Sequence, residues 1–365
     1  MESAVTNQKR LAHIDLLKCL AMYFVLLFHG TLYNNLVLPG MSVGHVLRYF
    51  SRTILSTCVP LFFFANGYLL LSRPLSLKRH SIKTVRLMLV TCFWMVFLLV
   101  VLQPYYGEYH TWEYLKNSWW ELRDGWNNQL WYMGVLIGIY FVFPVLKRTF
   151  DADKGAFYWF TGVVIFLTFG DNLLNLAVTI FDVVVKHSFY LYDNQLPVFQ
   201  MFNPFGYLFG MGLGYFCLGG VACALEERIL RIPSRWRNLA AGLGLAVCCF
   251  LLGMICWRFS LYRKYILDVV WFGYFTVFTL GSVVCLYVLT LNYRGENRLI
   301  RLIAANTLGI YFVHDIFHKI LGTVAVQFTF MQTLPGTIVH AAVLMLVSLG
   351  VCLVLKKLPI LKYLV

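Results

Sequence analysis

The sequence predicts an all-α polytopic membrane protein, formed by one domain over residues 1–365 and crossing the membrane about ten times. Its residues are 60% hydrophobic and only 13% charged, with a mean hydropathy of +0.72. A soluble domain of this size carries about 25% charged residues. The apolar residues gather in runs of about 20, the length that crosses a bilayer as a helix. Lys and Arg gather in alternate loops between those runs.

Each apolar run is predicted to form one transmembrane helix, because lipid offers no partner to an unpaired backbone group. The predicted spans are residues 14–34, 46–72, 84–104, 129–147, 157–175, 204–224, 239–257, 268–290, 302–322 and 338–356. The second run is longer than a bilayer requires, so we expect it to tilt or to kink at Pro60.

The basic residues predict the orientation, because Lys and Arg are enriched in cytoplasmic loops. With the amino terminus inside, the cytoplasmic segments contain Lys9, Arg10, Arg73, Lys78, Arg79, Lys83, Arg86, Lys147, Arg148, Lys154, Arg228, Arg231, Arg235, Arg237, Arg294, Arg298, Arg301, Lys356, Lys357 and Lys362. The predicted external loop 323–337 has no basic residue. We therefore expect both termini in the cytoplasm. This topology explains the net charge of +14, and we expect no nucleic-acid partner.

The ten cysteines are scattered through apolar runs without a Cys-x-x-Cys pair, which indicates small buried side chains. We expect neither a disulfide framework nor a metal site. The first run is long and lacks a small-residue cleavage pattern, so we expect no cleaved signal peptide.

The first span carries a polar stripe that includes Asp15, Lys18 and His29. Lys18 and His29 are eleven steps apart, which returns to within about 20° of the same helix face and separates them by roughly 16 Å. A histidine on an apolar span needs a partner inside the protein. One interpretation is a buried histidine bonded to a neighbouring helix. The other is a catalytic base deep in the membrane, above a cationic anchor at the cytoplasmic surface.

A basic run opens the third span. Lys83 and Arg86 are three residues apart on one helix face, and Arg79 precedes them by one turn. As a positive-inside loop, the run sets topology and contacts anionic lipid. The same charges are also placed to bind a phosphate-bearing ligand at the inner mouth of the bundle.

Tryptophans crowd the external loop 105–128 and the start of the next span, among them Trp119, Trp120 and Trp131. Such rings form an interfacial aromatic belt, and beside acidic residues they also stack on sugars.

His314 lies twelve residues into its predicted span, at a depth comparable to that of His29. His314 and His318 have the i,i+4 spacing of a metal pair, but no further ligand is evident in the sequence. The preferred interpretation is a hydrogen-bonded structural pair with Asp315 or Lys319.

Taken together, these residues resemble the acyltransferase-3 family of integral-membrane bacterial acyltransferases along essentially the whole chain. The matching motifs are Lys18 followed after ten residues by His29, Val59–Arg73 (VPLFFFANGYLLLSR), Lys83-x-x-Arg86, LWYMGVLIGIYFVFPVL in span four and LGIYFVHDIF in span nine. Three positions depart from the family pattern. Lys18 and Lys83 stand where Arg is usual, and Asn66 stands where Ser is usual. Lys keeps the charge but binds a phosphate as a point charge, without bidentate bonds.

The resemblance implies transfer of an acyl group, most often acetyl, from cytoplasmic acyl-CoA to a hydroxyl of a cell-surface or lipid-linked glycan, in a bacterial inner membrane. It implies catalytic roles for His29, Lys18 and Asp15. Acyl-CoA binding is expected at Lys18, Lys83, Arg86 and Arg79, and acceptor binding at Trp119, Trp120, Trp131 and His314. Histidine titrates near neutral pH, which suits it to accept the hydroxyl proton, although it could instead carry the acyl group.

The rival class is a polysaccharide exporter or flippase without acyl-transfer activity. Such a transporter also needs polar residues inside its bundle and aromatic rings along a sugar path. Transporters often show internal repeats or broken helices at corresponding positions in two halves. No clear repeat relates residues 1–175 to residues 204–365.

Overall fold

The computed structural model describes residues 11–30, 43–102, 130–186, 196–295, 297–325, 327–359 and 361–364. Over these residues the protein is all-α, as the sequence predicts, and contains no strand. Its main helices are α1 (Ala12–Phe28), α2 (Val43–Ser51), α3 (Cys58–Leu71), α4 (Leu77–Leu102), α6 (Trp131–Ala152), α7 (Lys154–Phe181), α9 (Tyr207–Leu230), α10 (Ser234–Arg263), α11 (Val269–Gly273), α12 (Val277–Thr290), α13 (Arg298–Ala325) and α14 (Leu334–Leu355).

Within the described residues, eight helices are long and apolar enough to cross a membrane. The protein is therefore a polytopic membrane protein. The predicted first and eighth spans correspond to shorter helices, since α1 has 17 residues and α12 has 14. Ten crossings with both termini in the cytoplasm stay a prediction.

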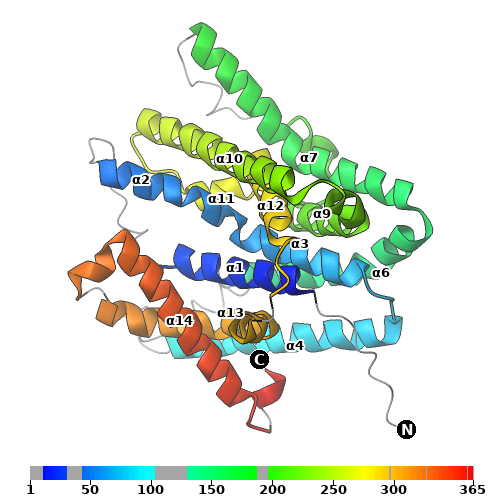
Figure 1. The fold of residues 1–365 in the computed structure, drawn as a ribbon, viewed down its shortest axis with the longest axis vertical. Coiled ribbons are helices and arrows are strands. Elements are labelled where there is room, and N and C mark those ends of the chain that lie inside the picture. The colour runs from blue at the N-terminus through cyan, green and yellow to red at the C-terminus, as the bar shows by residue number, and fades with distance from the viewer. Residues whose placement is uncertain are drawn as a thin grey trace.

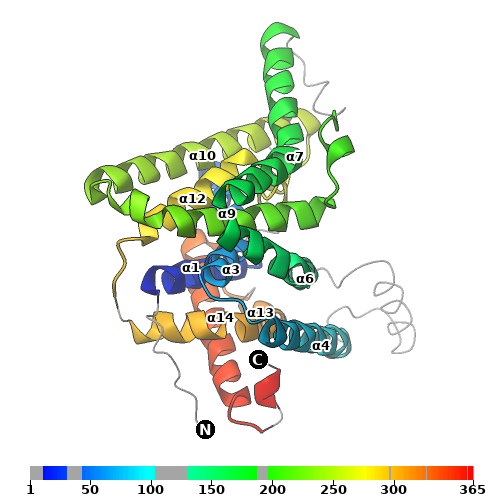
Figure 2. The same cartoon turned by 90° about the vertical axis from the view of Figure 1, so that its right-hand side faces the viewer.

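Helix α1 runs through the middle of the bundle (Figure 1, Figure 2). On one side of it lie α3, α9, α12, α10 and α7, and on the other lie α13, α4 and α14. Helix α1 packs directly against α3, α12, α13 and α14. The polar residues of α1 are thus placed to meet residues from both halves of the chain.

The first helix is shorter than predicted at its carboxyl end. The prediction of a span over 14–34 is corrected to a helix that ends at Phe28, with His29 as its C-cap and Gly30 after it. A Cβ on Gly30 would lie 2.8 Å from the Thr337 methyl carbon, so glycine lets α14 approach this end of α1. His29 therefore lies at a helix terminus packed against a neighbouring helix.

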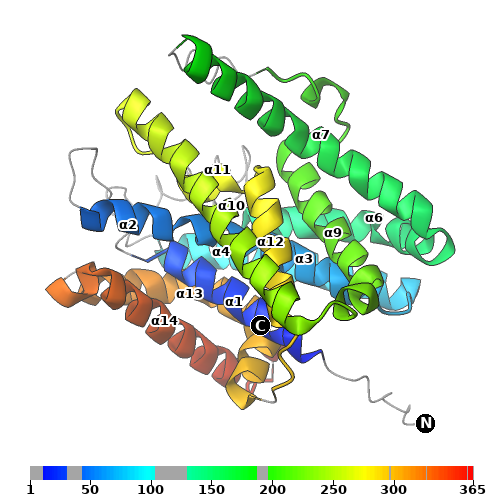
Figure 3. The same cartoon turned by 45° about the horizontal axis from the view of Figure 1, so that its top comes forward.

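Two predicted spans are interrupted where they face each other. The span 46–72 contains a 3₁₀ segment, η2 (Thr53–Thr57), just before α3, which includes Pro60. The expected tilt or kink at Pro60 stays a prediction. The span 268–290 is not one helix, because it breaks at residues 274–276 between α11 and α12. The hydroxyl oxygens of Ser56 and Thr279 lie 2.7 Å apart across the two breaks. Figure 3 shows α11 and α12 beside the segment formed by α2 and α3.

Glycines bring α3 and α9 into direct backbone contact. A Cβ on Gly67 would lie 1.8 Å from the Phe216 carbonyl oxygen, and one on Gly219 would lie 2.0 Å from the Phe64 carbonyl oxygen. Gly67 and Gly219 thus act as small residues that let the two helices pack closely. This contact fixes the position of Asn66, which lies one residue before Gly67 in the wall of the cavity described below.

Candidate functional site

The structure brings His29 together with histidines that are distant in the sequence. The ring centroids of His29 and His314 lie 5.3 Å apart, and those of His29 and His318 lie 6.2 Å apart. His340 of α14 follows, with its ring centroid 6.2 Å from that of His318. We call these four residues the histidine cluster.

His314 is held in one tautomer by its own helix. Its Nδ1 lies 2.6 Å from the carbonyl oxygen of Tyr311, and a carbonyl can only accept, so Nδ1 carries the proton. In the neutral ring, Nε2 then carries the lone pair. His314 is only 1% exposed, and its Nε2 has no hydrogen-bond partner among the described residues. The expected structural pair with Asp315 or Lys319 is therefore not the bond that orients His314.

A cavity of about 210 Å³ lies on the Lys18 side of this cluster. We call it the lysine cavity, because both Lys18 and Lys83 line it. Asn66, Tyr132, Tyr140 and Tyr311 add polar groups to its wall. Helices α1, α3, α4, α6 and α13 thus contribute to one chamber with two ammonium groups.

The polar wall of the lysine cavity is internally bonded. Asn66 donates its amide to the Tyr132 hydroxyl at 3.3 Å and accepts the Tyr140 hydroxyl at 3.1 Å. Lys18 donates to the carbonyl oxygen of Ala304 in α13. Lys83 lies with its ammonium 5.7 Å from the centre of the Tyr140 ring. These contacts fix where the positive charge lies relative to the cavity.

The lysine cavity leads toward the histidine cluster along α13. Its lining runs from Ala304, beside Lys18, to Tyr311, a distance of about 10 Å at the helical rise. The Tyr311 ring lies 5.6 Å from that of Tyr132 and 5.8 Å from that of His314. One end of this arrangement carries positive charge, and the other carries imidazoles.

Arg86 and Arg79 do not line the lysine cavity. Arg86 donates to the carbonyl oxygen of Tyr363 at 3.2 Å, and its guanidinium lies 5.3 Å from the Tyr363 ring centre. Arg79 is exposed near the start of α4. Of the four residues predicted to bind acyl-CoA, the structure joins Lys18 and Lys83 in one chamber and leaves these two outside its lining.

Asp15 lies in a different cavity, of about 430 Å³, which is also lined by His13, Glu226, Arg294 and Arg301. It is about 21 Å along α1 from His29. A direct catalytic role for Asp15 at the same reacting atom as His29 does not fit this placement.

The sequence did not single out Glu226, which anchors a polar cluster beside Asp15. Its carboxylate accepts the hydroxyls of Tyr68 and Tyr287, the latter at 2.9 Å, and lies 3.4 Å from Nε2 of His13. His340 was missed as well. Both are ionisable residues in or next to a predicted span, and this position could have identified them as candidate site residues.

The predicted acceptor residues are only partly within the described chain. Trp119 and Trp120 lie outside the described residues. Trp131 begins α6, and its ring lies 5.5 Å from that of Trp271. Trp131 immediately precedes Tyr132, which lines the lysine cavity.

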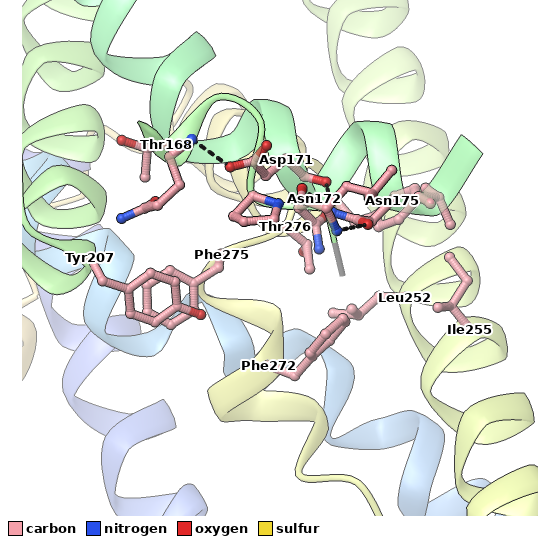
Figure 4. A pocket seen from close by; sticks show the side chains of 15 residues that line it. Thr168, Asp171, Asn172, Asn175, Tyr207, Leu252, Ile255, Phe272, Phe275 and Thr276 are labelled. Carbon is pink, nitrogen blue, oxygen red and sulfur yellow. Dashed lines mark hydrogen bonds between the residues drawn. The ribbon is translucent and has the colours of Figure 1, made fainter. Parts of the chain in front are cut away.

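A further pocket of about 300 Å³ lies between α7, α10 and the α11–α12 break (Figure 4). The Asp171 carboxylate accepts the backbone N–H groups of Phe199 and Gln200, each at 2.7 Å. Asn175 bonds both backbone groups of Leu196. These side chains hold a connecting segment onto α7, and the pocket lining includes no predicted site residue.

Among the described residues, no group of three or more His, Cys, Asp or Glu side chains has the geometry of a metal site.

A protein-family model described as an acyltransferase domain matches residues 11–357, nearly the entire chain. Comparison with curated proteins and with solved structures gives no match.

Proposed function

The chain belongs to the acyltransferase-3 family and is a membrane acyltransferase; from this premise, we propose that it moves an acetyl group from acyl-CoA to a hydroxyl of a cell-surface or lipid-linked glycan. The observation that carries the proposal is the path from the two ammonium groups of the lysine cavity, past Tyr311, to the His29–His314 pair. The ammonium groups suit a phosphate-bearing donor and the histidines suit a base, and the proposed reaction requires both.

The donor is proposed to bind at the lysine cavity. Lys18 and Lys83 supply positive charge for the phosphates of acyl-CoA, and each ammonium binds phosphate as a point charge. The cavity is too small for a whole coenzyme, so it receives part of the donor while the nucleotide stays at the mouth. The thioester then points toward Tyr311 and His314.

His29 is proposed to be the base. The acceptor oxygen attacks the thioester carbonyl carbon while its proton passes to the imidazole. The C–S bond breaks, and the departing sulfur takes up a proton, so that one C–O bond replaces one C–S bond. His314 lies beside His29 with its Nε2 lone pair inside the cluster, which suits it to orient the base and the acceptor.

A second possibility is that His29 carries the acyl group between donor and acceptor. An imidazole serves either role. Incubating the purified protein with labelled acetyl-CoA in the absence of glycan distinguishes them. Label that remains on wild-type protein after denaturation, and is absent from His29→Gln, indicates a carrier; protein without label indicates direct transfer.

The acceptor is proposed to be a glycan near Trp131, with Trp119 and Trp120 as stacking partners. The proposed location is a bacterial inner membrane, as the family resemblance implies. Both termini are proposed to lie in the cytoplasm, because basic residues fill alternate loops. An alkaline phosphatase fused after Val365 should be inactive in intact cells. An active fusion would contradict the proposed orientation.

The decisive experiment measures thiol release from acetyl-CoA by purified protein in detergent, with and without glycan from the producing cell. We expect glycan-dependent release and label transfer to the glycan. Movement of glycan across vesicles without thiol release would favour the exporter or flippase. Transporters also commonly contain interrupted helices, as this protein does at η2 and between α11 and α12, so this control is informative.

A further inference from the structure

Two histidines of the cluster lie beyond the pair to which the proposed function assigns roles. His318 is half-buried on α13, and His340 is 4% exposed on α14. In the described part of the chain, three ring nitrogens of the cluster are buried without a hydrogen-bond partner: His314 Nε2, His318 Nδ1 and His340 Nε2. Three such nitrogens next to one another require a physical reason.

Structural packing alone does not explain them. A buried polar nitrogen without a partner costs about 1–3 kcal/mol, and an apolar side chain of similar size would avoid that cost. Most buried polar groups in proteins are satisfied. The other polar cluster on α1 comes closer to that rule: its one such nitrogen, His13 Nε2, lies 3.4 Å from the Glu226 carboxylate, which accepts two tyrosine hydroxyls. The histidine cluster departs from it.

The four rings form a continuous series. The centroid separations run from 5.3 Å between His29 and His314 to 6.2 Å for His29–His318 and for His318–His340. At these separations a small ring rotation or one bridging water joins neighbouring nitrogens. His340 lies six residues into α14, about 9 Å from the start of that helix. The series thus runs from the end of α1 toward the α13–α14 connection.

We propose that His318 and His340 form a proton relay that connects His29 to the α13–α14 edge of the protein. The proposal rests on the proposed function, since it serves the base of that reaction. Neutral imidazole accepts a proton at one nitrogen and releases one from the other, so a series of imidazoles moves a proton without moving a ring far. Chains of ionisable residues inside membrane proteins commonly have this role.

The relay resets the base after each turnover. The acceptor hydroxyl loses its proton to His29, and the acyl C–O bond forms as the C–S bond breaks. His29 passes that proton to His318, which passes one from its other nitrogen to His340 and on to water at the α13–α14 connection. The departing thiolate takes its proton from water on the Lys18 side. One proton is released and one is taken up, so the reaction balances.

The experiment compares His318→Gln and His340→Gln with wild type in the purified full-length protein, using acetyl-CoA as the donor. Both substitutions keep a polar side chain but cannot relay a proton. We expect turnover to fall about tenfold, less than the ~10²–10⁴-fold for loss of the base itself. The solvent isotope effect on turnover should rise. Free imidazole should restore turnover in His340→Ala.

Ser348→Ala is the matched control, because Ser348 is also buried on α14 with an unpartnered hydroxyl and lies outside the cluster. It should leave turnover, isotope effect and imidazole response unchanged. Unchanged turnover in both glutamine variants overturns the relay. A loss with an unaltered isotope effect and no rescue by imidazole also overturns it, since this is the behaviour of residues that only support packing.

The charged neighbours of the series are held constant in these variants. Lys319 acts electrostatically on His29 and His318, and Asp315 acts on His314.

If wild-type protein releases no thiol from acetyl-CoA, the proposed function fails, and the relay is tested separately by ¹⁵N NMR of histidine-labelled protein. Coupled changes in the His29 and His318 ring signals in His340→Gln support it. Ring signals that are unaffected by His340→Gln reject it.

Discussion

The two ends of α1 each carry a histidine, and they differ in the groups that surround it. At one end, His13 meets the Glu226 carboxylate, which also accepts the hydroxyls of Tyr68 and Tyr287. At the other end, His29 meets His314 and His318, whose Nε2 and Nδ1, respectively, are buried without a hydrogen-bond partner among the described residues. Both clusters join α1 to helices from distant parts of the sequence.

From this difference we propose that the Glu226 end serves stability and the His29 end serves chemistry. A carboxylate with several donors fixes its neighbours in place, and each bond adds to the cost of disrupting the cluster. At the His29 end, His314 has an unpartnered Nε2, and its ring lies 5.8 Å from that of Tyr311, which lines the lysine cavity. We therefore expect substitutions at the His29 end to affect turnover and substitutions at the Glu226 end to affect stability.

The largest expected effect is at His29. His29→Ala should lower acyl transfer by about 10²–10⁴-fold, because a positioned base contributes that much to such a reaction. The variant should be made at normal levels and should unfold at the wild-type temperature. His13→Gln, on the same helix, is the matched control and should keep turnover within about twofold, whereas an equal loss in both variants would remove the contrast between the two ends.

The next effect concerns donor affinity. Lys18→Ala and Lys83→Ala should each raise the dissociation constant of acetyl-CoA about 10- to 100-fold, since a charge-assisted bond to phosphate contributes about 1.5–3 kcal/mol. Arg86→Ala should have a smaller effect, because Arg86 is bonded to Tyr363 and lies outside the cavity lining. Calorimetry across ionic strength measures this, with the largest differences at low salt.

Lys18→Arg should be tolerated if the cavity admits the larger guanidinium. Unchanged affinity in both alanine variants would place the donor elsewhere and assign these two charges to topology or lipid binding.

A substitution of Glu226 tests whether the end of α1 near His13 contributes to stability. Glu226→Ala removes the acceptor of two tyrosine hydroxyls, so it should lower the free energy of unfolding by about 1–3 kcal/mol. Thermal unfolding in detergent measures the change, and turnover measured well below the transition should be preserved. The adjacent, exposed Glu227 provides the control, since Glu227→Ala should change neither property. Lost turnover in folded Glu226→Ala protein would place chemistry at this end as well.

The smallest expected effect is at Tyr311, between the lysine cavity and His314. Tyr311→Phe keeps the ring that separates them and removes only the hydroxyl, so turnover should fall by a few-fold, in keeping with the ~1 kcal/mol of one neutral hydrogen bond. Tyr311→Ala should cost more, because it opens the wall of the cavity. Steady-state thiol release would resolve the two, and a loss in Tyr311→Phe as large as that in His29→Ala would make the hydroxyl a direct participant.

Much of the site was accessible from the sequence. Lys18 and His29 share a stripe on one helix because their spacing alone sets their relative direction, and Lys83 was placed at the start of the third span. The interruption at residues 274–276 was not predicted. Apolar composition shows which residues avoid water, but it does not show where Ser56 and Thr279 bring two backbone breaks together.

The sequence by itself determined the class of the protein: apolar runs of membrane-spanning length, positive charge in alternate loops and a lysine–histidine stripe all follow from local order along the chain. Only the tertiary structure decided which residues complete the site. His314, His318 and His340 join His29 because α13 and α14 pack against α1, and Asn66 reaches the lysine cavity because Gly67 lets α3 touch α9. Contacts between residues hundreds of positions apart depend on the angles at which helices cross. The shapes of the side chains on both helices set these angles, so the sequence of one helix alone does not determine them.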